Sequence, residues 1–133
     1  ELQRQKAWNK IWSWAGSVKR DNIRNESGQG YPNGQIDLPI KVNDVRNTFI
    51  VADIVYVING KERYDTITGF RSASGEKLLI GTTQYVNCNL SISDDGTKIG
   101  YYAGYVSKKV GLTTYVGYVK SIEVTQLITA KYY

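Results

Sequence analysis

Alternation of apolar and polar residues, interrupted by turn signals, is the feature that most constrains this chain. The segments QIDLPIKVN (35–43) and QYVNCNLSIS (84–93) carry an apolar residue at nearly every second position. This period of two matches a β-strand with one buried face, whereas a helix repeats every 3.6 residues. Turn signals separate such segments, among them Asn59-Gly60 and Asp94-Asp95-Gly96, and these favour tight hairpins. The sequence therefore predicts an all-β fold of about eight strands, an antiparallel β-sandwich of the jelly-roll-like kind.

The same pattern predicts where the strands lie. Pro39 donates no ladder hydrogen bond, so the strand over residues 36–43 should lie at a sheet edge or carry a bulge. The inward-facing residues of the segment 84–93 should be Val86, Cys88, Leu90 and Ile92. Further strands are expected over 11–18, 49–58, 61–68, 77–83, 97–106 and 113–125, with loops over 19–35, 69–75 and 108–111.

The start of the chain fits two descriptions. Trp8, Ile11 and Trp12 have helical spacing, but IWSWAGSV (11–18) also alternates as a strand does. We predict a short N-terminal helical or extended segment over residues 1–10, a linker from a larger protein, and a β-sandwich domain over residues 11–133. Because the chain contains no methionine, we expect it to be a fragment or a processed product.

The strand expected over residues 49–58 is apolar on both faces. Only Asp53 interrupts the run TFIVADIVYVI. One face can meet the opposite sheet, while the other needs a further layer, which the N-terminal segment, a loop of the same chain or another subunit could provide. The sequence leaves these alternatives open.

Composition and charge exclude several classes of function. The net charge is +5, and residues 1–24 carry six basic against two acidic side chains, so the rest of the chain is nearly neutral. A nucleic-acid interface needs a basic stripe on its binding face, and we expect no nucleic-acid partner. No apolar run approaches the roughly 20 residues that span a bilayer, so we expect no membrane insertion.

The chain also offers little enzyme chemistry. It has no histidine and a single cysteine, Cys88, which lies on the apolar side of its strand with no base to activate it. Asp94 and Asp95 could be read as a carboxylate pair, but adjacent residues in a hairpin turn point apart. There is no glycine-rich phosphate loop. We therefore expect a non-enzymatic protein with no catalytic residues, no metal site and no cofactor.

The stretch IGYYAGYVSKKVGLTTYVGYVKSIEV (99–124) interleaves tyrosine with glycine. The tyrosines could form platforms for sugar rings, or they could cover glycines of a paired neighbouring strand. Loops carry recognition more often than strands do, which directs attention to residues 107–112. The candidate ligand-binding residues are Tyr105, Tyr115, Lys108, Lys109 and Arg63.

The order of several segments resembles the C-terminal head domains of bacteriophage tail fibres and receptor-binding proteins. These segments, spread over residues 11–124, are IWSWAGSV, QIDLPIKV, NTFIVADIVYV, SISDDGTKI and YVGYVKSIEV. The resemblance implies a homotrimer at the distal tip of a tail fibre, extracellular on the virion. It also implies recognition of a host cell-surface glycan or protein, with other virion tail proteins attached through the N-terminal side.

Two other functions remain open from the sequence. The chain could be a structural shaft or assembly domain of a virion tail, whose surface contacts other virion proteins. It could also be a carbohydrate-binding module of a secreted enzyme, which we would expect to be monomeric.

Overall fold

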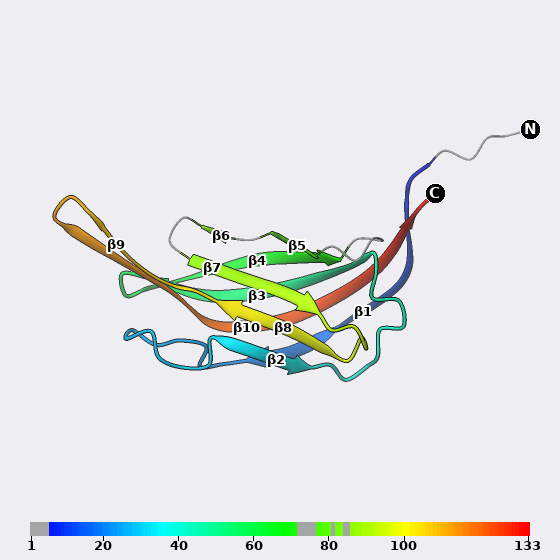
Figure 1. Cartoon of the computed structure of the whole chain (residues 1–133), viewed down its shortest axis with the longest axis horizontal. Helices are drawn as coiled ribbons and strands as arrows, with labels where there is room; N and C mark the ends of the chain where they lie inside the picture. Colours follow the sequence, from blue (N-terminus) through cyan, green and yellow to red (C-terminus); the bar gives the residue numbers. More distant parts are fainter. Residues whose placement is uncertain (1–5, 72–76, 81, 84–85) are drawn as a thin grey trace, which may run out of the picture.

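Figure 1 shows a computed structural model of the chain, which describes residues 6–71, 77–80, 82–83 and 86–133. Within these residues there are ten β-strands and no helix, which confirms the all-β prediction. The strands are β1 (Trp8–Arg20), β2 (Asn33–Asp37), β3 (Thr48–Ile58), β4 (Lys61–Arg71), β5 (Lys77–Ile80), β6 (Thr82–Thr83), β7 (Val86–Ile92), β8 (Lys98–Ala103), β9 (Tyr105–Val110) and β10 (Thr113–Tyr132).

The strands form two antiparallel sheets that pack as a sandwich. Sheet A has the order β1-β10-β3-β4-β5, and β9 also pairs with β10. Sheet B has the order β2-β8-β7-β6. The long strand β10 organises sheet A because one of its edges pairs with β3, while its other edge pairs with β9 and then with β1.

The core lies between the sheets and is built by the period-two alternation. Ile99 and Tyr101 of β8 and Ile50 and Ile54 of β3 belong to a single buried apolar cluster. The buried hydrophobic residues of this cluster are Ile23, Ile36, Val42, Ile50, Ala52, Ile54, Tyr56, Ile67, Cys88, Leu90, Ile92, Ile99, Tyr101, Ala103, Val119, Ile122, Val124 and Leu127. Residues of opposite parity in the same strands face outward, so the sandwich has two outer faces.

The hairpin predictions from glycine-containing turns are confirmed. Asn59 and Gly60 both have positive φ, 51° and 77°, as a type I′ turn between β3 and β4 requires. Gly96, with φ of 72°, closes the turn between β7 and β8. These turns depend on the readiness of their own residues to adopt a positive φ, which can be judged from the sequence alone.

Several strand boundaries differ from the prediction: β2 begins at Asn33, before the expected residue 36, while β4 runs to Arg71 and β10 to Tyr132, beyond the expected 68 and 125. The strand expected over 36–43 ends at Asp37, because Pro39 cannot donate to a ladder and disfavours continuation through Leu38. At the start of the chain, strand β1 begins at Trp8 rather than after Lys10, and residues 6 and 7 are not helical. The helical alternative for residues 1–5 falls outside the described residues.

The strand expected over 97–106 is in fact two strands in different sheets. Strand β8 ends at Ala103 in sheet B, and Tyr105 begins β9 in sheet A. The buried Gly104 is the residue at which the chain passes between the sheets. The loop expected over 108–111 is also wrong, since β9 continues to Val110 and only Gly111 and Leu112 turn the chain. The β9–β10 hairpin projects beyond the body of the sandwich (Figure 1).

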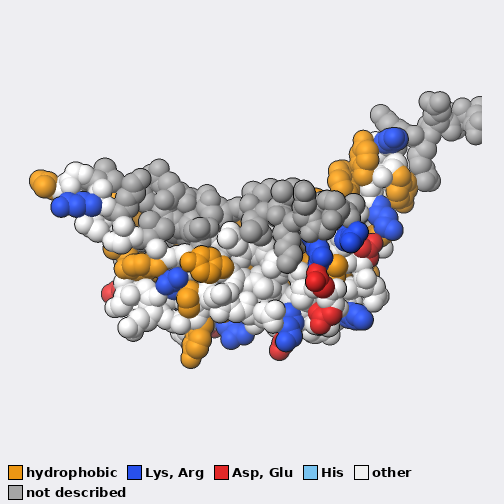
Figure 2. Space-filling view, in the orientation of Figure 1, with side chains coloured by type: hydrophobic (Ala, Val, Ile, Leu, Met, Phe, Trp, Pro, Cys, Tyr) orange, Lys and Arg blue, Asp and Glu red, His pale blue; other side chains and the backbone are white. Residues whose placement is uncertain are grey.

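The outer face of β3, which is apolar as predicted, is partly covered by other residues of the same chain. On the outer face Val57 is buried, while Val51 and Val55 are half-buried. At the end of the sheet near the chain termini, the Phe49 and Phe70 rings stack at 4.3 Å. Hydrophobic side chains gather at this end in Figure 2.

Two more aromatic residues complete this group. The Trp8 ring meets the Phe49 and Phe70 rings edge-on, each at 6.1 Å, and lies 5.7 Å from the Tyr132 ring. Trp8 is nevertheless 52% exposed. The outer face of sheet A therefore carries an aromatic cluster (Trp8, Phe49, Phe70, Tyr132) that this chain covers only in part.

Candidate functional site

The five residues expected to bind ligand do not form one site. Tyr115 and Lys108 are register partners in the β9–β10 hairpin, and Lys109 pairs with Thr114. Tyr115 is half-buried and Lys109 is exposed, while the Lys108 side chain lies outside what the structure describes. Arg63 is on β4, three strand spacings or roughly 14 Å from β9. The structure therefore joins Tyr115 with the two lysine positions and leaves Arg63 apart.

Tyr105 has a structural position at the base of the same hairpin. Its hydroxyl donates to the Glu26 carbonyl at 3.1 Å, and its ring lies 6.5 Å from the Tyr118 ring. A Cβ placed on Gly28 would lie 3.1 Å from the Tyr105 ring. Tyr105 thus anchors the loop that precedes β2 and does not stand free as a platform for a sugar.

Tyrosine does cover glycine in this fold, but with partners that the sequence did not indicate. The final strand does not pair with β8, so the expected contacts between these two strands do not form. Instead Tyr101 is the register partner of Gly34 on β2, where a Cβ would lie 3.1 Å from the Tyr101 hydroxyl oxygen. That hydroxyl donates to the Tyr31 carbonyl at 2.9 Å.

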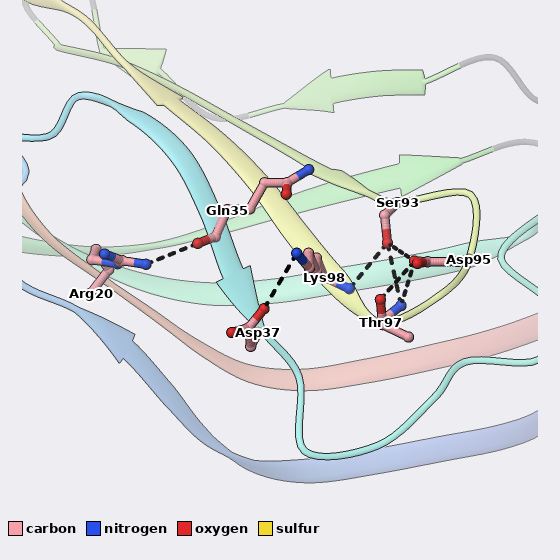
Figure 3. Close-up of polar contacts among 7 residues, drawn as sticks. All are labelled: Arg20, Gln35, Asp37, Ser93, Asp95, Thr97 and Lys98. Atoms are coloured by element: carbon pink, nitrogen blue, oxygen red, sulfur yellow. Dashed lines mark hydrogen bonds and ion pairs between the residues drawn. The ribbon is translucent and has the colours of Figure 1, made fainter.

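The two carboxylates of the β7–β8 turn have separate structural partners. Asp94 lies 2.7 Å from the Arg71 guanidinium. Asp95 accepts hydrogen bonds from the hydroxyls of Ser93 and Thr97 and from the Thr97 backbone NH, within the turn drawn in Figure 3. The hydrogen bond from Ser93, followed by those from Thr97, lowers the pKa of the Asp95 carboxyl to about 2. Both side chains serve the turn and do not form a paired acid and base.

Cys88 lies on the inner face of β7, as expected, and is buried. Burial raises the pKa of its thiol to about 12. A thiol in that state is not a nucleophile near neutral pH. Cys88 therefore acts as a small apolar side chain in the core.

The site whose geometry is most suitable for binding a ligand is an open groove of about 320 Å³ on the outer face of sheet B. Its lining comes from three neighbouring strands, β2, β8 and β7. The lining residues are Asn33, Gly34, Gln35, Asn89, Leu90, Ser91, Gly100, Tyr101 and Tyr102. None of them has a charged side chain.

Strand register arranges the outward side chains of this groove in two rows. In the first row Tyr102 of β8 lies between Asn33 of β2 and Asn89 of β7. In the second row Gly100 lies between Gln35 and Ser91. We call these six residues the sheet B groove set: Asn33, Gln35, Asn89, Ser91, Gly100 and Tyr102.

Gly100 makes the hollow in the middle of the second row. A Cβ at this position would lie 3.0 Å from the Ser91 hydroxyl oxygen, and no other atom outside its chain neighbours comes closer than 3.8 Å. Tyr102, 45% exposed, stands next to the hollow along β8. The groove therefore joins an exposed aromatic ring to a cavity edged by amides and a hydroxyl.

Polar contacts hold the end of the groove opposite Tyr102 (Figure 3). Arg20 donates from Nη2 to the Gln35 carbonyl at 2.9 Å, which ties β1 to β2. Lys98 lies 3.9 Å from Asp37 at the next register step. In Figure 3 the Gln35 side chain projects away from Arg20 and toward β8, so its amide is available to the groove.

Such a set of residues suits a neutral, hydroxyl-rich ligand. Asparagine and glutamine amides each offer donors and an acceptor, a serine hydroxyl offers both, and an aromatic ring offers a flat apolar surface. A small number of placed polar groups around an apolar contact is the usual composition of a small-molecule site. A charged ligand would find no counter-ion within the lining.

A second open groove of about 560 Å³ lies on the outer face of sheet A. It is lined by Lys19, Asp21, Asn22, Val55, Glu62, Tyr64, Lys120 and Ser121. Its charges lie in pairs, with Lys19 3.4 Å from Asp21 and Lys120 donating to Glu62. The hydrogen bond from Lys120 lowers the pKa of the Glu62 carboxyl.

The sequence contained part of the signal for the sheet B groove. Asn89 and Ser91 were expected on the outward face of their strand, and Gly100 and Tyr102 on a common face of theirs. What was missing was the pairing of these strands with each other and with Gln35. A pattern within one strand does not identify its neighbour in the sheet.

Residues 6–71, 77–80, 82–83 and 86–133 hold no group of three histidine, cysteine, aspartate or glutamate side chains that could bind a metal ion. They also hold no helix with the length and hydropathy needed to cross a membrane. No protein family matches the chain, and neither a curated protein nor a solved structure is significantly similar to it.

Proposed function

We propose that this domain is a non-enzymatic receptor-binding module that recognises a neutral cell-surface glycan through the sheet B groove. The observation that carries the proposal is the two-row arrangement of the groove set, in which Tyr102 and the hollow over Gly100 are flanked by Asn33, Gln35, Asn89 and Ser91. A pyranose has two apolar faces and an equatorial rim of hydroxyls. Stacking on the ring and hydrogen bonding to the rim need the side-chain types that line this groove.

The resemblance to bacteriophage tail-fibre heads suggests host attachment as the biological setting. An open groove on a sheet gives weak binding at each site, of order millimolar, which corresponds to about 4 kcal/mol. Several copies on one tip would raise the avidity by about 10² or more. The same groove would also serve a carbohydrate-binding module of a secreted enzyme, and oligomeric state separates these two settings.

Replacing Tyr102 with alanine is expected to weaken glycan binding by about 10-fold, because an aromatic contact of this kind contributes about 1.4 kcal/mol. The measurement is a glycan array with the purified domain, followed by calorimetric titration of the best neutral ligand. The matched control is Tyr64→Ala, since Tyr64 is 73% exposed on sheet A, away from the groove. If Tyr64→Ala reduces binding and Tyr102→Ala does not, the site lies on the other sheet.

The outer face of sheet A supports a second proposal, that other copies of this chain cover it in a homotrimer. Light scattering should then give about three times the 15.0 kDa chain mass, and Val55→Glu should lower that mass because it places a charge on the half-buried face. Thr114→Glu, on an exposed position of the β9–β10 hairpin, is the control. A monomer at micromolar concentration would rule out the trimer and favour the module of a secreted enzyme.

A further inference from the structure

The lining of the groove ends at Asn33 on β2, and the exposed Tyr31 lies two residues before it in the chain. We propose that Tyr31 is a second aromatic platform of the same site, and that the ligand is an extended neutral oligosaccharide of at least two sugar rings bound along β2 and β8. This inference rests on the proposed glycan-binding function. Tyr31 is not among the residues that line the groove, so the groove by itself does not indicate this role.

The backbone places Tyr31 on the groove side of the sheet. Pro32 follows it, and the residue before a proline is held in an extended conformation. The pairing of β2 with β8 also continues past Asn33, because the Ala103 NH donates to the Pro32 carbonyl at 2.7 Å. In an extended chain residues two apart share a face, so Tyr31 follows Gln35 and Asn33 on the outer face of sheet B.

Three contacts fix the backbone around Tyr31. Its NH donates to the Asn22 carbonyl at 3.1 Å, and its carbonyl accepts from the buried Tyr101 hydroxyl at 2.9 Å. At Gly30, φ is 145° and a Cβ would lie 2.5 Å from the Ile23 carbonyl oxygen, so the chain can pass this point only without a side chain. The backbone of Tyr31 is thus held rigidly.

The side chain of Tyr31 contrasts with this fixed backbone, since it is 66% exposed. The contact that holds this segment against the sheet is made by the buried Tyr101, whose hydroxyl donates to the Tyr31 carbonyl. A rigidly held backbone with an exposed ring loses little conformational entropy on binding, which is what a stacking platform needs.

The length of the combined site defines the ligand class. From Tyr31 to Gln35 the chain advances four residues, roughly 13 Å at the rise of a β-strand. Tyr102 is the register partner of Asn33, so it is a diagonal neighbour of Tyr31, roughly 7–8 Å away between backbone positions. The whole site is therefore longer than one sugar ring, and Tyr31 and Tyr102 would contact neighbouring rings of one chain. The absence of charge from the groove lining points to a polymer of neutral sugars.

The test compares short and long ligands on the full chain. Mono- to hexasaccharides of the gluco-, manno- and xylo-series are titrated by calorimetry against wild type, Tyr31→Ala, Tyr31→Phe and Tyr102→Ala. We expect affinity to rise with length in the wild type. Tyr31→Ala should weaken the binding of the longer ligands only, by about 3- to 10-fold, because one aromatic contact is lost. Tyr31→Phe keeps an aromatic ring and should bind as the wild type does. An unchanged melting temperature is expected for both Tyr31 variants because the hydrogen bonds of this residue are made by its backbone.

The outcomes separate the two proposals. If Tyr102→Ala weakens all ligands while Tyr31→Ala weakens none, the glycan site stands and the extended site is overturned. If Tyr31→Ala weakens a monosaccharide as much as a hexasaccharide, both residues contact one ring and the extended ligand is overturned. If no oligosaccharide binds the wild type, the proposed function itself fails.

Discussion

Replacing Gly96 with alanine is expected to destabilise the domain by about 3–5 kcal/mol and lower its melting temperature by more than about 10 °C. A Cβ at this position would lie 2.0 Å from the Val42 carbonyl oxygen and 2.9 Å from the Val42 carbonyl carbon. Both are backbone atoms, so a side-chain rotation cannot relieve the clash. The φ of 72° adds strain for any residue with a Cβ.

The clash at Gly96 would also disturb the packing of the core. The Val42 NH donates to the Gly96 carbonyl at 2.9 Å, which holds the segment between β2 and β3 against the β7–β8 turn. Val42 itself is almost fully buried. Displacing this segment therefore costs a hydrogen bond and exposes a valine side chain, about 1 and 1.5–3 kcal/mol respectively.

Gly60 provides a matched control for this substitution. It also has a positive φ, 77°, but a Cβ there would meet nothing within 4 Å. Gly60→Ala should therefore show the cost of backbone strain alone, about 1 kcal/mol. Thermal melts of the two variants measure the difference, and equal losses of melting temperature would mean that the contact with Val42 contributes nothing.

The fold class could be predicted from the sequence because its signals are local. Alternation assigned Val86, Cys88, Leu90 and Ile92 to the core side of β7, and the structure buries the last three, while the Val86 side chain lies outside what the structure describes. The Asn59-Gly60 pair predicted its hairpin because the preference for positive φ belongs to those two residues. Each of these inferences needed only neighbouring residues.

The site could not be predicted because it depends on which strands become neighbours. Gly104, where the chain crosses from sheet B to sheet A, appears in the sequence as one more glycine within an alternating strand. Without that crossing, Tyr105 was assigned to the same strand as Tyr102, over residues 97–106, whereas it begins β9. The groove set comes from three strands far apart in sequence, and only their register brings Gln35, Gly100 and Ser91 into one row.

Filling the hollow at Gly100 is expected to reduce glycan binding by at least as much as any truncation in the groove. Gly100→Leu places a branched side chain between Gln35 and Ser91, where the proposed ligand lies. We expect a loss of at least about 10-fold in affinity, equivalent to 1.4 kcal/mol. Gly100→Ala should have a smaller effect because it fills less of the hollow.

The fold should tolerate this change, which makes the result interpretable. Gly100 is in a strand without a positive φ, and the nearest atom to an added Cβ is the Ser91 hydroxyl oxygen at 3.0 Å, the end of a side chain that can rotate. A side chain in place of glycine also lowers the entropy of the unfolded chain. The melting temperature of Gly100→Leu should therefore be equal to or above that of the wild type.

The control for displacement of Ser91 is Ser91→Ala, alone and combined with Gly100→Leu. Ser91→Ala removes a hydroxyl but leaves the hollow open, so it should cost at most one hydrogen bond, about 1 kcal/mol. If binding depends on the hollow, the double variant should bind as poorly as Gly100→Leu, because removing the Ser91 hydroxyl does not reopen the space that leucine fills. If instead Gly100→Leu binds as the wild type does while remaining folded, the ligand does not enter the sheet B groove, and the charged groove on sheet A becomes the site to test.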